Sequence, residues 1–243
     1  MSNHTENSKV TAPKVSIIIP ARNEEKSLPI VINALKNQTL APFQIIVVDS
    51  ASTDKTGEVG RSLGAEVIRE ERIGTNNALE TGRSLAKGEF LARIDADCIP
   101  EKDWVEKAIK IFEDEKVVCV TGPYDYYDSE WVFRNLSYFA QKYIYFCASI
   151  FMRVFNLGGI IIEGNSMMRT ATMQKIGGFN RDIIFYGDGT DLAKNLCKHG
   201  KVIFNRHLAM KTSARRFKNE GTLKVSIKYI KEFLKVVIKP SKL

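Results

Sequence analysis

A repeated unit of apolar strand, acidic carboxyl end and helix start limits the folds open to this chain. Val15–Ile19 precedes an acidic helix start, Phe43–Ser50 carries Asp49 near its end, and Phe90–Ile94 runs directly into Asp95-Ala96-Asp97. Such strands alternate with helices in doubly wound α/β domains, which bind ligands at the carboxyl ends of their parallel strands. The sequence therefore predicts an α/β domain with polar chemistry gathered along one edge of its sheet.

Helical segments fall between and after these strands. Apolar periodicity and end signals predict four helices, over Ser27–Asn37, Thr53–Leu63, Asn76–Leu85 and Lys102–Asp114. Two further strands are predicted at Val67–Arg69 and Val117–Thr121. The 243 residues are enough for one large α/β domain, and a second domain is not required.

Asp95 and Asp97 form the most informative candidate site. Alternate residues of an extended strand point to the same side, so both carboxylates face one region of space. Carboxylate oxygens suit hard divalent cations, and Mg²⁺ in particular takes one or two protein carboxylates and completes its shell with water and substrate phosphates. The pair therefore predicts a Mn²⁺ or Mg²⁺ site for a phosphorylated substrate.

Six segments, in this order along the chain, resemble those of the family 2 inverting glycosyltransferases of the GT-A fold. They are Ile17–Glu25, Val47–Asp54, Asp95–Asp97, Glu163–Arg169, Gly177–Phe179 and Tyr186–Leu192, and the likeness extends over Val15–Phe217. The resemblance implies one Rossmann-like α/β domain whose mixed, mostly parallel sheet is flanked by helices. It also implies an enzyme that transfers a sugar from a nucleotide-sugar donor with Mn²⁺ or Mg²⁺ as cofactor.

The chain divides into three expected parts. Residues 1–12 are polar without periodicity, which predicts a disordered leader. Residues 13–221 would form the GT-A domain, with a nucleotide-binding half at 13–122 and an acceptor half at 123–221. Residues 222–243 are expected to form a basic amphipathic helix.

The resemblance also assigns binding residues. The base and ribose pocket falls to Pro20, Ala21, Arg22, Glu24 and Asp49. Asp97 would contact the metal directly, while Asp95 would contact the ribose or reach the metal through water. Arg215 or Arg216 would clamp the diphosphate, because guanidinium groups bind phosphate in a bidentate manner. Glu163, Gly164 and Asn165 would face the acceptor.

The catalytic base departs from the family pattern. Relatives begin this motif with Glu-Asp-x-Asp-Leu and use the second residue as the base that deprotonates the acceptor hydroxyl. Here Asp188 matches the Glu, and Gly189 occupies the position of the base. Three interpretations remain: Asp188 is the base, which we favour, Asp191 is the base, or the enzyme is impaired. Asp191 has an alternative structural role as the N-cap of a helix over 192–198.

Charge and motif content restrict the partners. The formal net charge is +8, which suits nucleic acid, a nucleotide-sugar or an anionic membrane. Acidic strand ends would repel nucleic-acid phosphates, so nucleic acid is not an expected partner. A sugar-phosphate nucleotidylyltransferase is an alternative, but a Gly-rich basic loop should then follow the first strand, and Pro20–Glu25 is acidic and free of glycine. Because Gly189 replaces the usual base, a protein that binds a nucleotide-sugar without catalysis is a further alternative.

Two segments suggest a membrane or lipid partner. The 32 residues Tyr124–Phe155 hold 12 of the chain's 23 aromatic residues, which predicts either a helical pair packed on the sheet or a helix that faces the acceptor or lies on a membrane. Within Leu223–Lys239, lysines and apolar residues form neighbouring helical stripes, typical of a helix on an anionic membrane or of one docked on the domain. The expected acceptor is a glycan or a polyprenyl-phosphate-type lipid.

The expected location is cytoplasmic, with a possible peripheral position on the inner face of the cell membrane. The four cysteines are scattered without metal-type spacing, which is typical of reduced thiols in the cytoplasm. Residues 1–12 contain no apolar run of the kind that a secretory signal needs.

Overall fold

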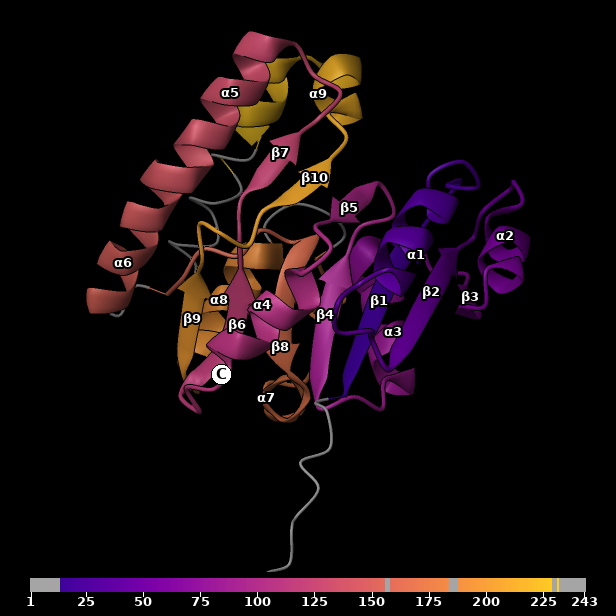
Figure 1. The fold of residues 1–243 in the computed structure, drawn as a ribbon, viewed down its shortest axis with the longest axis horizontal. Coiled ribbons are helices and arrows are strands. Elements are labelled where there is room, and N and C mark those ends of the chain that lie inside the picture. Colours follow the sequence, from indigo (N-terminus) through magenta and orange to yellow (C-terminus); the bar gives the residue numbers. More distant parts are fainter. Residues whose placement is uncertain (1–13, 156–157, 184–187, 229–230, 232–243) are drawn as a thin grey trace, which may run out of the picture.

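The computed structural model describes residues 14–155, 158–183, 188–228 and 231 of the chain. Its main sheet has seven strands in the order β3-β2-β1-β4-β8-β6-β9, and a smaller sheet has the order β5-β10-β7 (Figure 1). The strands are β1 (Val15–Ala21), β2 (Gln44–Ser50), β3 (Glu66–Glu70), β4 (Phe90–Ile94), β5 (Cys98–Pro100), β6 (Val117–Thr121), β7 (Tyr124–Tyr126), β8 (Asn165–Arg169), β9 (Lys201–Phe204) and β10 (Met210–Thr212).

Helices cover both faces of the main sheet. They are α1 (Leu28–Lys36), α2 (Thr56–Ser62), α3 (Thr75–Leu85), α4 (Trp104–Ile111), α5 (Trp131–Phe139), the π-helical η1 (Ala140–Tyr145), α6 (Phe146–Val154), α7 (Thr170–Lys175), α8 (Asp188–Cys197) and α9 (Arg215–Glu220). Residues 222–228 are also helical. The sheet, its flanking helices and its single-domain organisation confirm the predicted GT-A-type α/β fold.

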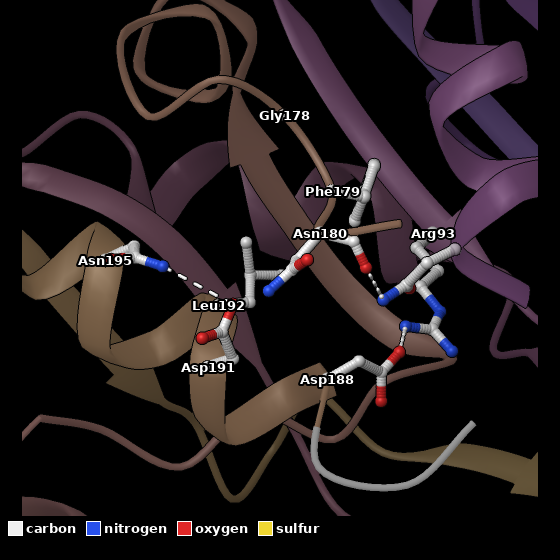
Figure 2. Close-up of a pocket in the computed structure, with 9 residues that line it drawn as sticks. Arg93, Gly178, Phe179, Asn180, Asp188, Asp191, Leu192 and Asn195 are labelled. Carbon is white, nitrogen blue, oxygen red and sulfur yellow. Dashed lines mark hydrogen bonds and ion pairs between the residues drawn. The ribbon is translucent and has the colours of Figure 1, made fainter. Parts of the chain in front are cut away.

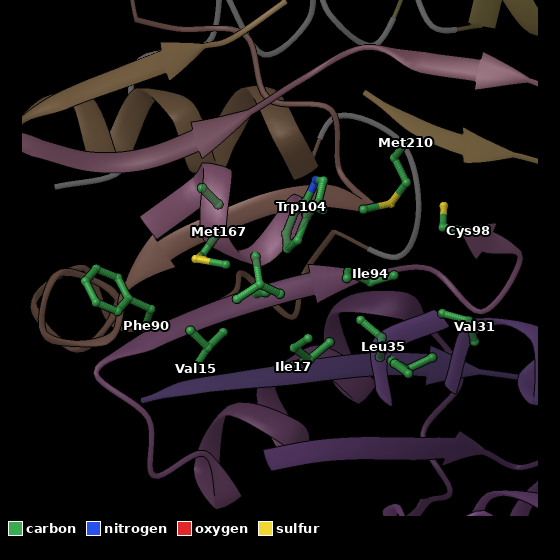
Figure 3. Packing of buried hydrophobic residues seen from close by; sticks show 14 of the residues in the cluster. Val15, Ile17, Val31, Leu35, Phe90, Ile94, Cys98, Trp104, Met167 and Met210 are labelled. Carbon is green, nitrogen blue, oxygen red and sulfur yellow. The ribbon is translucent and has the colours of Figure 1, made fainter. Parts of the chain in front are cut away.

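The core has two layers, one on each face of the sheet. Ile17 and Ile19 of β1 lie in the layer that contains Trp104 and Leu35, whereas Ile18 lies in the opposite layer. Figure 3 shows Ile17, Leu35 and Trp104 in the first of these layers. Side chains alternate between the two faces of a strand, and here both faces are covered. This double burial explains why β1 is a continuous apolar run in the sequence instead of an alternating one.

The direction of β8 determines which segments meet at the site. β1, β2, β3 and β4 pair in parallel, but β8 runs antiparallel to β4, with Ile94 opposite Asn165. The residues just before β8 therefore lie beside those just after β4. This register brings Glu163 and Gly164 close to Asp95, although 68 positions separate Glu163 from Asp95 in the sequence.

The aromatic segment differs from the predicted pair of helices. α5, η1 and α6 follow one another without a break and form one long rod beside β7 and β9 (Figure 1). The expected pair is therefore wrong, because residues 139–146 keep helical backbone angles throughout the junctions. Within the described residues, no helix combines the length and the apolar character needed to cross a membrane.

Two expectations fall partly or wholly outside the described residues. The leader at 1–12 is not described, and the amphipathic helix at 222–243 is described only at 222–228 and 231. The four cysteines are all free thiols.

Candidate active site

The loops after β1 and β2 are joined by hydrogen bonds. The backbone N–H of Asn23 donates to Ser52 Oγ at 3.0 Å, and that of Glu24 donates to Thr56 Oγ1 at 2.8 Å. Asn23 and Ala51 adopt positive φ angles of 56° and 51°. A non-glycine residue in this region is uncommon, and alanine lacks a side chain that could compensate. The two loops therefore hold a defined shape at the carboxyl ends of their strands.

Asp49 lies at the floor of this region. Its Oδ1 accepts a hydrogen bond from the Ser52 backbone N–H at 3.0 Å, and its Oδ2 lies 3.4 Å from Arg69. A Cβ atom at Gly57 would stand 3.0 Å from Oδ2, so the glycine lets α2 approach the carboxylate closely. The residue is 6% exposed. Its oxygens are oriented by the protein and lie where the resemblance expects a base or ribose contact.

Arg215 links two of the predicted site residues. Its guanidinium forms a two-pronged ion pair with the buried Glu24, and its Nε lies 3.2 Å from Asp97 Oδ2. Arg216 lies beside it and interacts electrostatically with Glu220. Because the Arg215 side chain is about half exposed (49%), it is accessible to a ligand while its charge is positioned by the two carboxylates.

Asp97 carries an unfavourable charge when no ligand is present. Burial, together with the negative charge of the nearby Asp95, raises the pKa of its carboxyl to about 6, although Arg215 offsets part of the effect. A carboxylate that is buried beside a second carboxylate is stabilised by a bound cation. The aspartate pair therefore has the electrostatics of a cation site.

The available ligands fit Mn²⁺ or Mg²⁺. Both side chains offer hard oxygen atoms, and no cluster of three or more histidine, cysteine, aspartate or glutamate ligands occurs among the described residues. A site with two carboxylates leaves positions for water and for substrate phosphates, which is the usual arrangement for Mg²⁺. Cys98 follows directly but is fully buried, and burial raises the pKa of its thiol well above the usual range.

A hollow of about 250 Å³ opens beside Asp97. Its wall includes Ser27 and Ile30 of the α1 region, Tyr127 after β7, and Arg215. This cavity lies directly beside the proposed metal position and has room for part of a phosphorylated ligand.

Arg93 lies at the centre of a buried acidic cluster. The side chain is 3% exposed and lies 2.6 Å from Asp188, 3.6 Å from Glu163 and 3.7 Å from Asp95. Burial opposes its positive charge, but the surrounding carboxylates outweigh burial and raise the pKa of Arg93. One guanidinium therefore connects the aspartate pair after β4 to the N-terminus of α8.

Glu163 and Asp188 share this cluster, but their pKa values shift in opposite directions. Burial, together with the negative charge of Asp188, raises the pKa of Glu163 well above its usual range. Burial acts in the same direction on Asp188, but the charge of Arg93 prevails and lowers the pKa of Asp188. Arg93 therefore favours the charged form of Asp188 more strongly than that of Glu163.

Asp188 and Asp191 point into different surroundings. Figure 2 shows Asp188 turned toward Arg93, whereas Asp191 faces Asn195, whose amide donates to it at 3.4 Å. Both residues line a small cavity of about 10 Å³, closed on the other side by Phe179 and Asn180. Because α8 begins at Asp188, Asp191 lies in its first turn, so the predicted N-cap role of Asp191 and the predicted helix start at 192 are wrong.

Gly189 has no room for the usual base. A Cβ atom there would stand 2.8 Å from the backbone oxygen of Ile161 and 3.1 Å from Glu163 Cγ. Real Cβ atoms rarely approach other atoms so closely, and a backbone oxygen cannot move aside as a flexible side chain can. A carboxylate at position 189 would displace the segment before β8.

The three predicted acceptor residues have separate roles. Glu163 belongs to the Arg93 cluster, and Gly164 allows close contact, because a Cβ there would stand 2.4 Å from Asp95 and from the Tyr124 hydroxyl. Asn165 is fully buried, accepts from Trp104 at 2.8 Å and donates to Leu208 at 2.8 Å. The predicted acceptor contact of Asn165 is therefore wrong, because its amide is committed to bonds that hold the core together.

The remaining predicted residues lie where β1 ends. Pro20 and Ala21 close the strand, Ala21 is buried, and Arg22 is exposed on the loop that follows. Sequence reasoning missed Arg93 and Tyr124, whose hydroxyl lies 3.5 Å from Asp95. An arginine inside the otherwise apolar strand Phe90–Ile94 was the available signal, because a buried charge requires partners.

Comparison with known proteins agrees with this architecture. The family model described as Glycosyl transferase family 2 matches residues 16–177. The chain is 27% identical to glycosyltransferase AglE of Haloferax volcanii over 186 residues, which cover 73% of this chain and 60% of that protein. It is 37% identical over 94 residues to the 4,4'-diaponeurosporenoate glycosyltransferase of Staphylococcus haemolyticus, covering 36% of this chain and 25% of that protein.

Two solved structures show the same fold. The mannosyltransferase PcManGT of Pyrobaculum calidifontis, in complex with GDP-Man and Mn²⁺, has a TM-score of 0.74 at 20% identity and covers 96% of this chain and 67% of that one. Glucosyl-3-phosphoglycerate synthase of Mycobacterium tuberculosis, with Mn²⁺, UDP and glucosyl-3-phosphoglycerate, has a TM-score of 0.63 at 18% identity, covering 94% and 81%.

The fold and the aspartate pair at its strand ends are consistent with an α/β protein of the glycosyltransferase class. The chain belongs to glycosyl transferase family 2, as the match over most of its length shows. It spans about three fifths of the length of its Haloferax relative.

Proposed function

We propose that this chain is a metal-dependent inverting glycosyltransferase that moves a sugar from a nucleotide-sugar to a glycan or polyprenyl-phosphate-type acceptor. The observation that carries the proposal is that Asp97 and Arg215 pair with each other and line one hollow, with Asp95 two residues before Asp97. Two carboxylates for a cation and one cation for an anion together suit a metal-bound diphosphate. The Mn²⁺ and nucleotide ligands of the two structural relatives support this choice.

In the proposed mechanism, Asp49 and Glu24 orient the nucleoside, and Asp97 holds the cation with Asp95 close by. When bound, the cation would act as a Lewis acid that neutralises the leaving diphosphate. Arg215 would exchange part of its pairing with Glu24 and Asp97 for the diphosphate, since it is already oriented and half exposed. These residues position the donor without taking part in bond making.

Asp188 is the proposed base. Its charge persists near neutral pH because Arg93 holds its pKa low, and Arg93 connects it to Asp95 through a single guanidinium. Inversion by direct displacement requires an ionised carboxylate that removes the proton of the acceptor hydroxyl. Asp191 is the alternative, since it lies one helical turn further along α8 and is more exposed.

The proposed site of action is the cytoplasmic face of a membrane. The free cysteines and the basic charge support it, as does the apolar rod beside the site. A non-catalytic nucleotide-sugar binder is a second candidate, because Gly189 leaves no room for the family base. A nucleotidylyltransferase is not favoured, because the loop after β1 places Glu24, not a basic side chain, beside the phosphate-binding region.

The test is donor turnover with Mn²⁺. A panel of UDP-, GDP- and dTDP-sugars is incubated with the protein, and release of the nucleoside diphosphate is measured with and without a lipid-phosphate or glycan acceptor. The proposal expects release from one donor class that stops when the metal is chelated. Tight donor binding without any release, in the presence of each acceptor class, would instead identify a binder.

A further inference from the structure

The outer face of the α5–η1–α6 rod is unusually apolar. Eleven of the seventeen large apolar side chains that are exposed in the described chain lie within residues 131–155. Seven of the exposed positions follow one another at steps of three and four and form a stripe along the rod, called here the outer stripe: Val132, Leu136, Phe139, Tyr143, Cys147, Ile150 and Val154. At about 1.5 Å per residue, the stripe extends over roughly 30 Å.

The inner face of the rod is mixed where it contacts the domain, because Phe133 packs against Tyr126 and Phe217, and Tyr145 against Phe204. Gln141 and Ser149 are the buried residues of the rod among those described. Gln141 accepts a hydrogen bond from the Tyr124 backbone N–H at 2.9 Å. Surface helices of water-soluble domains turn most of their large apolar side chains toward the core, whereas the rod leaves eleven of them exposed. The outer stripe therefore requires an apolar environment that this chain does not itself supply in the described residues.

Charge indicates what covers the stripe. Residues 131–155 contain Arg134, Lys142 and Arg153 and no aspartate or glutamate. The neighbouring segment 215–231 contains six lysines and arginines and one glutamate. Of the basic residues in the two segments, Arg134, Arg215, Lys218 and Lys228 pair with acidic side chains of this chain, and the others supply the net positive charge. A second copy of this chain would bring the same positive charges to the contact and no acidic partners for them. An anionic lipid surface offers both the negative charge and the apolar interior.

The rod is connected to the active site. Gln141 binds the backbone of Tyr124, whose side-chain hydroxyl lies 3.5 Å from Asp95. At the other end, Phe133 of α5 stacks against Phe217 of α9 with ring centroids 5.1 Å apart, two residues after Arg215. Figure 1 shows α5 and α9 next to each other at the same end of the molecule. Direct contacts therefore join the rod to the segments that carry Asp95 and Arg215.

We propose that the outer stripe lies in the headgroup and upper acyl region of an anionic membrane, with the rod parallel to the bilayer plane, so that a lipid-linked acceptor reaches the site without leaving the membrane. The class of acceptor rests on the proposed function, whereas the membrane contact rests on exposure and charge alone. Amphipathic helices with aromatic residues on one face and basic residues nearby bind membranes in this manner.

Vesicle flotation tests the contact directly. The full chain is mixed with vesicles of phosphatidylcholine alone, or of phosphatidylcholine and phosphatidylglycerol in equal amounts. Binding to the anionic vesicles is expected, and it should weaken at high salt because exposed charges are screened beyond about 10 Å at 0.1 M. Phe139→Glu should lower the partition coefficient about tenfold or more, since it places a charge where an exposed apolar side chain would enter the membrane. Arg153→Glu should reduce only the part that depends on anionic lipid.

Phe43→Glu is the matched control, because Phe43 is exposed to a similar extent (51% against 57% for Phe139) in the loop before β2, far from the rod in sequence. It should bind vesicles like the wild type. Equal losses in both glutamate variants, or no binding of the wild type to either vesicle, would overturn the proposal. So would a stable dimer in light scattering that Phe139→Glu dissociates, because the stripe would then be a protein interface.

Nucleotide binding separates this proposal from the proposed function. Calorimetry with GDP and UDP in Mn²⁺ should give the same affinity for Phe139→Glu as for the wild type, which also shows that the variant is folded. A wild type that binds vesicles but no nucleotide would contradict the proposed function and leave the membrane contact in place. The reverse result would contradict only the membrane contact.

Discussion

The buried cluster around Arg93 and the α5–η1–α6 rod differ in what they bury and what they expose. Around β4, the protein buries charge: Arg93 is 3% exposed and Asp188 5% exposed. On the rod it exposes apolar surface instead, with Trp131 76% and Leu136 67% exposed. Buried charges are stable only with partners, and exposed apolar faces usually mark an interaction site. Each region therefore has a property that is unusual for a folded domain, namely buried charge or exposed apolar surface. We expect each to bind a partner of a different kind.

Two arginines compensate the negative charges of the carboxylates in the cluster. Arg93 compensates three carboxylates, and Arg215 compensates Asp97 and Glu24, so no carboxylate of this group lies alone. The Asp97 carboxyl still has a raised pKa, which locates the residual imbalance at the proposed metal position. On the rod, the unusual feature is exposed apolar surface, which extends along the whole length of the three helical segments. The predictions below test whether the two regions are independent.

The largest expected effect is the loss of activity in Asp97→Asn. The substitution removes the charge that would hold the cation, and stabilisation of a leaving group by a metal contributes several kcal/mol. Turnover should fall by about 10²–10⁴-fold. Asp103→Asn, at an exposed carboxylate that pairs with Lys107, is the control and should be nearly silent. If the turnover of Asp97→Asn lies within a factor of a few of the wild-type value, the assignment of the metal to this position is wrong.

The second prediction concerns Asp188. Asp188→Asn should lower turnover by about 10²–10⁴-fold with donor affinity unchanged, because a base contacts the acceptor and not the donor. Breaking its buried pair with Arg93 also costs about 3–5 kcal/mol of folding stability, so turnover is compared at a temperature where both proteins are folded. Asp191→Asn should retain activity. If the two results are exchanged, Asp191 is the base.

A third, smaller effect is expected at Gly189. Gly189→Ala places a Cβ 2.8 Å from the Ile161 oxygen, and overpacking of this kind costs about 1–3 kcal/mol of stability. Thr190→Ala, at the next and half-buried position, should change stability by about 0.5 kcal/mol or less. Chemical denaturation measures both. An undisturbed Gly189→Ala protein would show that the family carboxylate can fit there, and Gly189→Asp would then become a test for an impaired enzyme.

The smallest effect is a gain of stability in metal-free Asp97→Asn. The folded-state pKa of about 6 lies above the ordinary value of 3.8, so the folded state binds more protons between these pH values. Stability from this group is present below about pH 4 and is lost as the pH rises through 6. At pH 7 the variant should be more stable than the wild type by about 1–2 kcal/mol. Thermal unfolding in a chelator checks this, and the difference should shrink at pH 4.

The sequence predicted the sheet well because β1, β2 and β4 are apolar runs that end in acidic residues. The acidic end of β4 pointed to Asp95 and Asp97, but the expected strand spacing is wrong, because β4 ends at Ile94 and Ala96 and Asp97 lie in a turn. The Arg93 cluster could not be assembled, because its contacts depend on the antiparallel register of β8, which no local pattern encodes. Asn165 was misjudged for the same reason: its partners Trp104 and Leu208 lie far away in sequence.

The predicted pair of helices in the aromatic segment 124–155 was wrong for a different reason. Its apolar positions fit a helix, but the pattern does not tell whether the apolar side faces the sheet or the outside. The buried side combines Gln141 and Ser149 with aromatic contacts such as Phe133 against Phe217, and many large apolar side chains of the rod stay exposed. The choice of side depends on these contacts with distant segments, which is a tertiary property.

The most direct test of the central claim is calorimetric titration of GDP and UDP into the wild type and Asp97→Asn, each with Mn²⁺ and with a chelator. If the strand-end carboxylates hold a metal-bound diphosphate, one nucleotide should bind the wild type at least about tenfold more tightly with Mn²⁺, which corresponds to about 1.4 kcal/mol. Asp97→Asn should show no such gain. Equal affinities with Mn²⁺ and with the chelator in the wild type would contradict the account.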